Sequence, residues 1–286
     1  MDIRKKKIAF LLLMSMFGCL GPVVRGISLP TPVIVWARAA ISAAALAVFL
    51  LLSRRGSRGS VRSYLLPMLF SGVLLAVDWI GLFASYRYTT IATATLCYYI
   101  SPVLVLIGAA VYLKEALSKR QLICILIAFI GMAFVSGVAE NGLPALSEIR
   151  GVLLAFLGAA AYAAIILINR KYPGDPLLKT FLQLATAALI MTGYLLWNGD
   201  FRGITVSGKD VVLLLVMGIL MTALAYIAYF HLMVQIPSSS VAFFSFADPV
   251  VAVIISIFFL GEPFSLYAAV GALMIIGAAA YSERTP

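Results

Sequence analysis

The sequence predicts an all-α integral membrane protein, with ten transmembrane helices arranged as two inverted five-helix repeats. Its 286 residues are 63% hydrophobic and 11% charged, whereas a soluble domain carries roughly 25% charged residues. The apolar residues form repeated runs of roughly 20, the length of a helix that crosses a bilayer. Because a backbone in lipid must satisfy its own hydrogen bonds and the runs lack the alternation of barrel strands, the spans are expected to be helices.

Ten spans follow one another along the chain. Arg4-Lys5-Lys6-Lys7 precedes the first apolar run, as in a signal peptide, but no A-x-A site follows, so an uncleaved span is expected. The links at 86–90 and 234–238 are very short, and polar residues and Pro237 mark the breaks there. The predicted spans are 8–25, 31–53, 64–86, 90–113, 121–138, 151–169, 177–197, 209–234, 238–260 and 264–282.

The basic residues predict the orientation. With the N-terminus inside, 15 of the 21 Lys and Arg residues fall on the inner side, five fall on the outer side, and Arg38 lies within a span. Inner loops of membrane proteins carry such an excess. We therefore predict a multi-pass protein of the inner or plasma membrane with both termini cytoplasmic. Its net charge of +10 then faces anionic lipid head groups, and no nucleic-acid partner is expected.

A broken apolar helix occurs twice. Ser101-Pro102-Val103 leads on to Leu113-Lys114-Glu115, and Asp248-Pro249-Val250 leads on to Leu260-Gly261-Glu262, 147 residues later. Alignment of 101–118 on 248–265 matches six of 18 positions, among them a Pro, a Glu and a Ser. Because each half holds an odd number of spans, the second copy must be inverted, as in many secondary transporters. The expected parts are a first repeat at 1–138, an external linker at 139–150 and a second repeat at 151–286.

Two charged residues are expected at similar depth below the outer surface. Arg38 lies about 10 Å deep in the second span and Asp78 about 12 Å deep in the third, from a rise of about 1.5 Å per residue. Ionisable groups in a span usually face a protein interior or a wet cavity. Arg38 and Asp78 either form a structural ion pair or bind the charged ends of a zwitterionic or anionic solute.

The proline breaks predict a second polar site near the midplane. Helical spacing places Tyr98 and Ser101 on one face, and Ser245 and Asp248 on another. Pro102 and Pro249 are the expected hinges, since each removes a helical hydrogen bond. Phe244 neighbours the second break and is a further candidate for contact with solute. Other aromatic residues either line a pocket or belong to the interfacial belt or core: Trp36, Tyr99, Tyr162, Tyr226 and Tyr229. Asp248 is the candidate for proton coupling; the alternative is that it caps a broken helix turn and never changes its protonation state.

Catalytic and metal-binding patterns are missing from the sequence. It contains no GxSxG, HExxH or Walker-type glycine loop, and one histidine, His231. Its cysteines lie in apolar runs, so neither a metal site nor a disulfide framework is expected. Glu115 and Glu262 are expected to hold the turns into the next spans. The small residues Gly151, Ala155, Ala159 and Ala163 favour close helix packing.

The two broken helices, each ending on L-x-E before the last span of its half, resemble those of EamA-type transporters of the drug/metabolite transporter superfamily. The similarity covers nearly the whole chain and is best in 79–118 and 237–280. It implies ten helices, alternating access, often in the direction of export, and a central cavity lined mainly by spans 1, 3, 4, 6, 8 and 9. The charges depart from a symmetric scheme, because Arg38 corresponds to Gln183 and Asp78 to Ala225 in the second half.

These features together predict a secondary transporter rather than an enzyme. The expected solute is a small polar metabolite, an amino acid or similar zwitterion, moved outward without a cofactor by a monomer or homodimer. The alternatives are an importer of a nucleoside, vitamin or organic cation, a membrane-embedded enzyme and a passive channel. The predicted solute-binding residues are Arg38, Asp78, Tyr98, Ser101, Phe244, Ser245 and Asp248.

Overall fold

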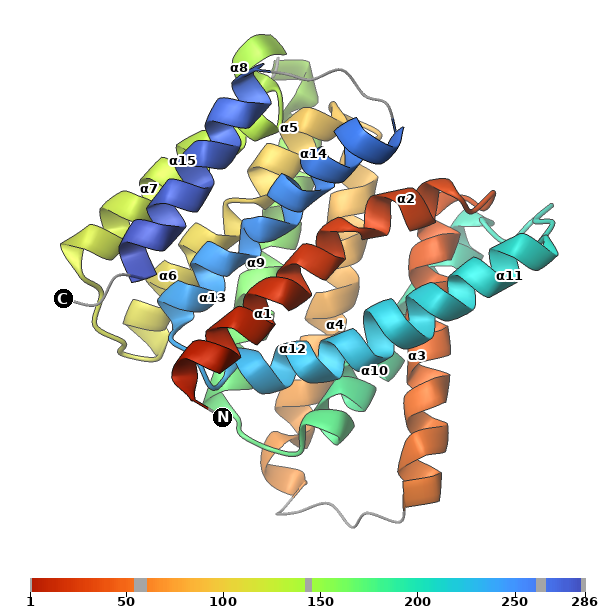
Figure 1. Cartoon of the computed structure of the whole chain (residues 1–286). Coiled ribbons are helices and arrows are strands. Elements are labelled where there is room, and N and C mark those ends of the chain that lie inside the picture. The colour runs from red at the N-terminus through yellow and green to blue at the C-terminus, as the bar shows by residue number, and fades with distance from the viewer. Residues whose placement is uncertain (1, 54–60, 142–145, 261–265, 284–286) are drawn as a thin grey trace.

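The computed structural model describes residues 2–53, 61–141, 146–260 and 266–283, and this part of the chain is helical, without a strand (Figure 1). The first half contains α1 (Ile3–Gly18), α2 (Leu20–Arg25), α3 (Thr31–Ser53), α4 (Arg62–Ser85), α5 (Ile91–Tyr98), α6 (Ser101–Tyr112), α7 (Lys119–Val135) and α8 (Val138–Asn141). The second half contains η1 (Leu146–Glu148), α9 (Ile149–Lys171), α10 (Pro176–Asn198), α11 (Gly208–Leu215), η2 (Val216–Leu224), α12 (Ala225–Met233), α13 (Ser238–Ser245), α14 (Ala247–Leu260) and α15 (Leu266–Glu283).

The helices confirm an all-α membrane protein. Seven helices among the described residues are long and apolar enough to cross a membrane, and the shorter apolar helices 238–252 and 266–282 follow them. Each predicted span coincides with a helix or with consecutive helices. The expected broken helices are α5–α6 and α13–α14, which separate at Tyr99-Ile100 and at Phe246.

The packing of the helices repeats itself when the two halves are exchanged. Helix α4 packs on α9 as α12 packs on α1, and α6 packs on α9 as α14 packs on α1. Similarly, α10 packs on α4 as α3 packs on η2. The pairs α7–α15, α3–α10 and α6–α13 join equivalent helices of the two halves. This pattern is that of a pseudo-two-fold axis, and with five spans per half it relates two inverted repeats.

Small residues bring α4 and α9 together. A Cβ atom at Gly81 would lie 2.9 Å from the Leu154 carbonyl oxygen, and one at Gly158 would lie 2.9 Å from that of Asp78. Ala155 and Ala159 are fully buried in the same helix. The predicted close packing of this span is therefore confirmed, and it fixes Asp78 against the second half.

A buried polar cluster fastens α4, α9 and α10. Gln183 accepts hydrogen bonds from Ser71 at 2.7 Å and from Asn169 at 2.9 Å. Lys179, 3% exposed, donates to the carbonyls of Asn169 and Tyr172 at 3.0 and 2.8 Å. Lys179 is one of the 15 inner basic residues that were expected to face lipid head groups, and for this residue the expectation is wrong, because its cation binds the carbonyls at the C-terminal end of α9.

The eighth span contains a π-helical segment that the sequence pattern did not indicate. In η2, Thr222 Oγ1 donates to the Met217 carbonyl at 2.8 Å. Gly218 lies against α3, where the Ser42 hydroxyl is 2.6 Å from its carbonyl oxygen. Such segments are frequent beside functional sites, and this one packs on the turn of α3 that follows Arg38.

Candidate functional site

A cavity of about 290 Å³ lies at the centre of the bundle. Both broken helices contribute to it, together with α1, α2, α3, α4, α9 and α12. Spans 1, 3, 4, 6, 8 and 9 therefore line it, as the family resemblance implied, and Arg38 adds the second span. The lining residues are Met14, Phe17, Leu20, Arg38, Leu75, Asp78, Trp79, Leu82, Phe83, Tyr86, Thr95, Tyr98, Tyr99, Ser101, Tyr162, Ile165, Tyr226, Tyr229, Phe230, Ser245 and Asp248.

Aromatic side chains hold the guanidinium group of Arg38. Its Nη2 donates to the Tyr226 hydroxyl at 3.2 Å, and its Cζ lies 4.4 Å from the centroid of the Trp79 ring. Its buried Nε has no hydrogen-bond partner among the described residues. The Arg38 side chain is half-buried, so part of the cation remains accessible. This arrangement presents a positive charge with spare donors at the cavity wall.

Asp78 lies in the cavity wall without a basic partner in direct contact. The side chain is 2% exposed and accepts a hydrogen bond from Tyr98. Its Oδ1 atom is buried and unpaired within the described part of the chain. In that part no ion pair joins Asp78 to Arg38, although the opposite charges still attract each other. Of the two predicted interpretations of this pair, a direct structural ion pair is therefore wrong.

Asp248 connects the two halves at the broken helices. Its Oδ2 accepts a hydrogen bond from the Tyr99 hydroxyl at 2.9 Å. Tyr99 lies in the break of the first half, and Asp248 lies in the first turn after the break in the second. The carboxyl group is half-buried and lines the cavity. A solute or proton bound there would contact both halves.

Tyrosine hydroxyls and serines form the rest of the polar surface. The Tyr162 hydroxyl lies 2.8 Å from that of Tyr229 and 3.5 Å from Ser245 Oγ. Tyr98 and Tyr162 pack with ring centroids 6.1 Å apart. Ser101 begins α6, and Ser245 ends α13. The cavity therefore combines aromatic faces, which bind cations, with hydroxyl groups that both donate and accept.

Two aromatic candidates from the sequence lie elsewhere. Phe244 does not belong to the described cavity lining, and its ring lies 6.5 Å from that of Phe10. Trp36 donates to Thr192 at 2.8 Å and contacts Phe201 edge to face.

Pro102 and Pro249 lie in the first turns of α6 and α14, directly after the breaks. Glu262 lies outside the described residues.

Several cavity residues were not among the predicted solute-binding residues. Trp79 was not considered, and Tyr226 and Tyr229 were expected either in a pocket or in the core, because aromatic residues are common in apolar runs. Helical spacing offered a signal, because Leu75, Asp78 and Leu82 share one face of α4. Tyr99 was considered only as one of many aromatic residues, since the spacing favoured its neighbour Tyr98. Its bond to Asp248 depends on how the two halves meet.

Comparison with known proteins gives consistent results. The chain is 29% identical over 213 residues to the uncharacterized transporter YxxF of Bacillus subtilis, covering 73% of this chain and 67% of the relative. It is 24% identical over 247 residues to the uncharacterized transporter YyaM of the same organism, covering 84% and 80%. A solved crystal structure shares the fold with a TM-score of 0.84 at 18% identity over 98% of both chains.

The sequence profile of a single family matches the chain twice. The two matches cover residues 5–137 and 149–282, one in each half. Together they span nearly the whole chain, and their number agrees with the two related sets of helices in the structure. This protein thus belongs to the EamA-like transporter family.

Proposed function

We propose that this membrane transporter is a secondary transporter that exports a small zwitterionic metabolite of the amino-acid type by alternating access. The observation that carries the proposal is the pair of unsatisfied opposite charges at one cavity, Arg38 Nε and Asp78 Oδ1. A buried polar atom without a partner costs about 1–3 kcal/mol. A solute with both a carboxylate and an ammonium group would supply partners to both residues.

Charge and shape support a zwitterion. The carboxylate of the solute would bind the Arg38 guanidinium, which can donate two parallel hydrogen bonds to such a group. The ammonium group would lie towards Asp78 and Asp248, among the tyrosine rings. The cavity of about 290 Å³ is close to the lower end of ligand pockets, about 300–1,000 Å³. It therefore suits a solute of a few heavy atoms rather than a large drug.

The proposed direction and coupling rest on the predicted orientation. The excess of basic residues favours a protein of the inner or plasma membrane with both termini in the cytoplasm. The cavity residues Leu20, Phe83 and Tyr86 lie near those ends of their spans that are predicted to face outward, so the cavity extends towards the predicted outer end. Asp248 would carry a proton inward as solute leaves. The protein would work as a monomer or homodimer.

A set of matched solutes tests the proposal. Leucine, its decarboxylated amine and its deaminated acid differ only in the charged groups, and each is added to purified protein in a thermal-shift assay. We expect leucine to raise Tm more than either analogue, because it alone pairs both charges. Counterflow in proteoliposomes then measures transport of the solute that binds. Equal shifts with all three compounds would contradict zwitterion recognition.

An organic cation is the second candidate. Two carboxyl groups, Asp78 and Asp248, and one guanidinium group, Arg38, line the cavity. Aromatic rings at the same wall favour a cation as well. If the amine raises Tm more than leucine does, the solute is a cation, and import by the membrane potential becomes the favoured direction.

A further inference from the structure

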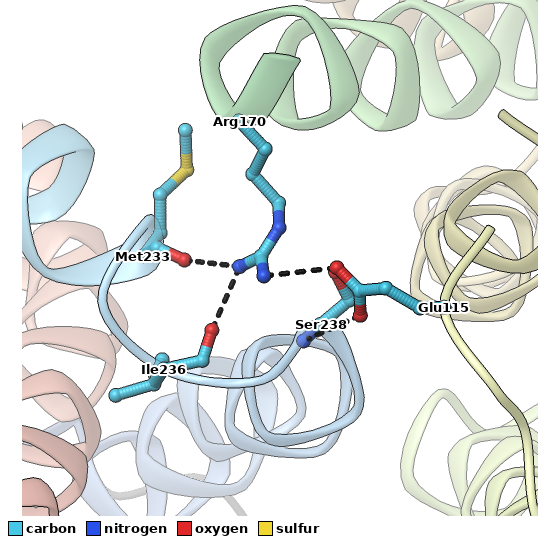
Figure 2. Close-up of polar contacts among 5 residues, drawn as sticks. All are labelled: Glu115, Arg170, Met233, Ile236 and Ser238. Carbon is cyan, nitrogen blue, oxygen red and sulfur yellow. Dashed lines mark hydrogen bonds and ion pairs between the residues drawn. The ribbon is translucent and has the colours of Figure 1, made fainter. Parts of the chain in front are cut away.

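Another cluster of polar contacts is made by residues that do not line the cavity (Figure 2). It joins Arg170 near the C-terminal end of α9, Glu115 after α6, and the connection between α12 and α13. The N-terminus of the chain lies at the same end of the bundle (Figure 1), so this is the predicted cytoplasmic end. We call the contacts among Arg170, Glu115, Met233, Ile236 and Ser238 the latch.

Arg170 satisfies the end of one helix. Its Nη1 donates to the carbonyls of Met233 and Ile236 at 2.5 and 2.7 Å. These carbonyls belong to the last residue of α12 and to the connection that follows, where a cation is favoured by the helix dipole. Figure 2 shows the guanidinium between the two carbonyls and the Glu115 carboxylate.

Glu115 occupies the start of the next helix. Its carboxylate accepts from Arg170 Nη2 at 3.0 Å, from the Ser238 hydroxyl at 3.0 Å and from the Ser238 backbone N–H at 3.4 Å. Ser238 is the first residue of α13, so the negative charge lies where the helix dipole favours it. Glu115 was expected to hold the turn into its own next span. Instead it binds the other half.

An apolar seal lies between the latch and the cavity. In α9, Ile165 lines the cavity and Arg170 belongs to the latch. In α13, Ser245 lines the cavity and Ser238 belongs to the latch. Those serines are seven positions apart, which corresponds to about 10 Å of helix. The apolar side chains that are 0–1% exposed in these intervals and on the facing part of α6 include Val105, Leu106, Ala109, Ile166, Val241 and Ala242.

We propose that Arg170 and Glu115 form the gate that holds the predicted cytoplasmic end closed in this conformation. The inference rests on alternating access in the proposed function. Glu115 belongs to the first half, and its partners belong to the second. Rocking of the halves about the broken helices would separate Glu115 from Arg170, part α6 from α13 and open the cavity to that end.

A buried reporter cysteine tests the gate without any solute. Val105, in the seal, is replaced by Cys in a protein whose Cys19, Cys97 and Cys124 are replaced by Ala. A membrane-impermeant maleimide is applied to inside-out and right-side-out vesicles. Because Glu115→Gln removes a charge-assisted contact between the halves, we expect labelling from the cytoplasmic side to rise at least about tenfold, equivalent to about 1.4 kcal/mol. Arg170→Lys, which cannot reproduce the fork of contacts, should raise the rate as well.

Two controls separate gating from unfolding. Glu148→Gln removes a carboxylate that accepts from Thr89 at the predicted outer end, and it should leave the rate unchanged. A reporter at Met191→Cys, buried in α10, should stay unlabelled in every variant. Equal rates for Val105→Cys with and without Glu115→Gln, in both vesicle preparations, would overturn the gate. A rise only in right-side-out vesicles would keep the gate and overturn the predicted orientation.

A protein that moves none of the tested solutes but shows the rise would keep the gate and refute only the proposed solute.

Discussion

Replacing Arg38 with Gln separates solute recognition from stability. The guanidinium is held by Tyr226 and Trp79, and its Nε has no partner in the described part of the structure. A hydrogen bond to a charged group contributes about 1.5–3 kcal/mol. Since about 1.36 kcal/mol is tenfold, Arg38→Gln should weaken binding of a solute carboxylate about 10- to 150-fold.

The same substitution should change stability little. It removes a cation–π contact of about 0.5–2 kcal/mol and a hydrogen bond from a charged group, about 1.5–3 kcal/mol. It also removes the buried, unpaired Nε, whose desolvation costs about 1–3 kcal/mol. The second contribution offsets much of the first, so we expect Tm to fall by no more than a few degrees.

The assay compares two solutes on two variants. Calorimetry measures the Kd of an α-amino acid that binds the parent and of its methyl ester, which lacks the carboxylate. Arg38→Gln should weaken binding of the acid and leave binding of the ester nearly unchanged. Arg150→Gln, which removes an exposed cation outside the cavity, should affect neither. Equal loss for the acid and the ester would refute the assignment of Arg38 to the carboxylate.

Two further predictions concern coupling and packing. Asp248→Asn keeps an acceptor for Tyr99 but cannot carry a proton, so it should abolish pH-dependent transport in proteoliposomes while the protein remains folded; an unchanged pH profile would remove Asp248 from coupling. Gly158→Ala places a Cβ atom 2.9 Å from the Asp78 carbonyl oxygen, and overpacking should cost about 1–3 kcal/mol. Gly193→Ala meets nothing within 4 Å and should stabilise its helix by about 0.5–1 kcal/mol; a thermal melt that ranks the two variants the other way would contradict the packing.

The helices and their breaks were predictable because each depends on local chemistry. Apolar length sets a span, and Pro102 and Pro249 each remove a backbone donor, so the positions of α5–α6 and α13–α14 follow from the sequence. The π-helical turn at η2 does not follow in this way. It depends on the close approach of Gly218 to α3, a contact between segments far apart in the chain.

The site was predictable only where a residue is costly in a membrane. Arg38, Asp78 and Asp248 stand out because few ionisable groups occur within spans, and the structure brings all three to one cavity. Placing Tyr226 and Tyr229 in a membrane span costs little free energy, so the sequence does not single them out. Their position as neighbours of Arg38 and Tyr162 appears only in the packed bundle. The latch was hidden for another reason, since Glu115 and Arg170 belong to different halves and have ordinary positions beside loops.

The asymmetry of the charges makes the two end conformations unequal. Gln183, which corresponds to Arg38, is buried among Ser71 and Asn169 instead of facing the cavity. Exchange of the two halves therefore reproduces the helix packing but not the guanidinium group. Under the proposed function, a solute carboxylate bound to Arg38 would stay with α3 when the halves rock, and the contacts that change would be those with the broken helices. The repeat would then provide two accessible conformations, and the single arginine would give the solute one orientation in both.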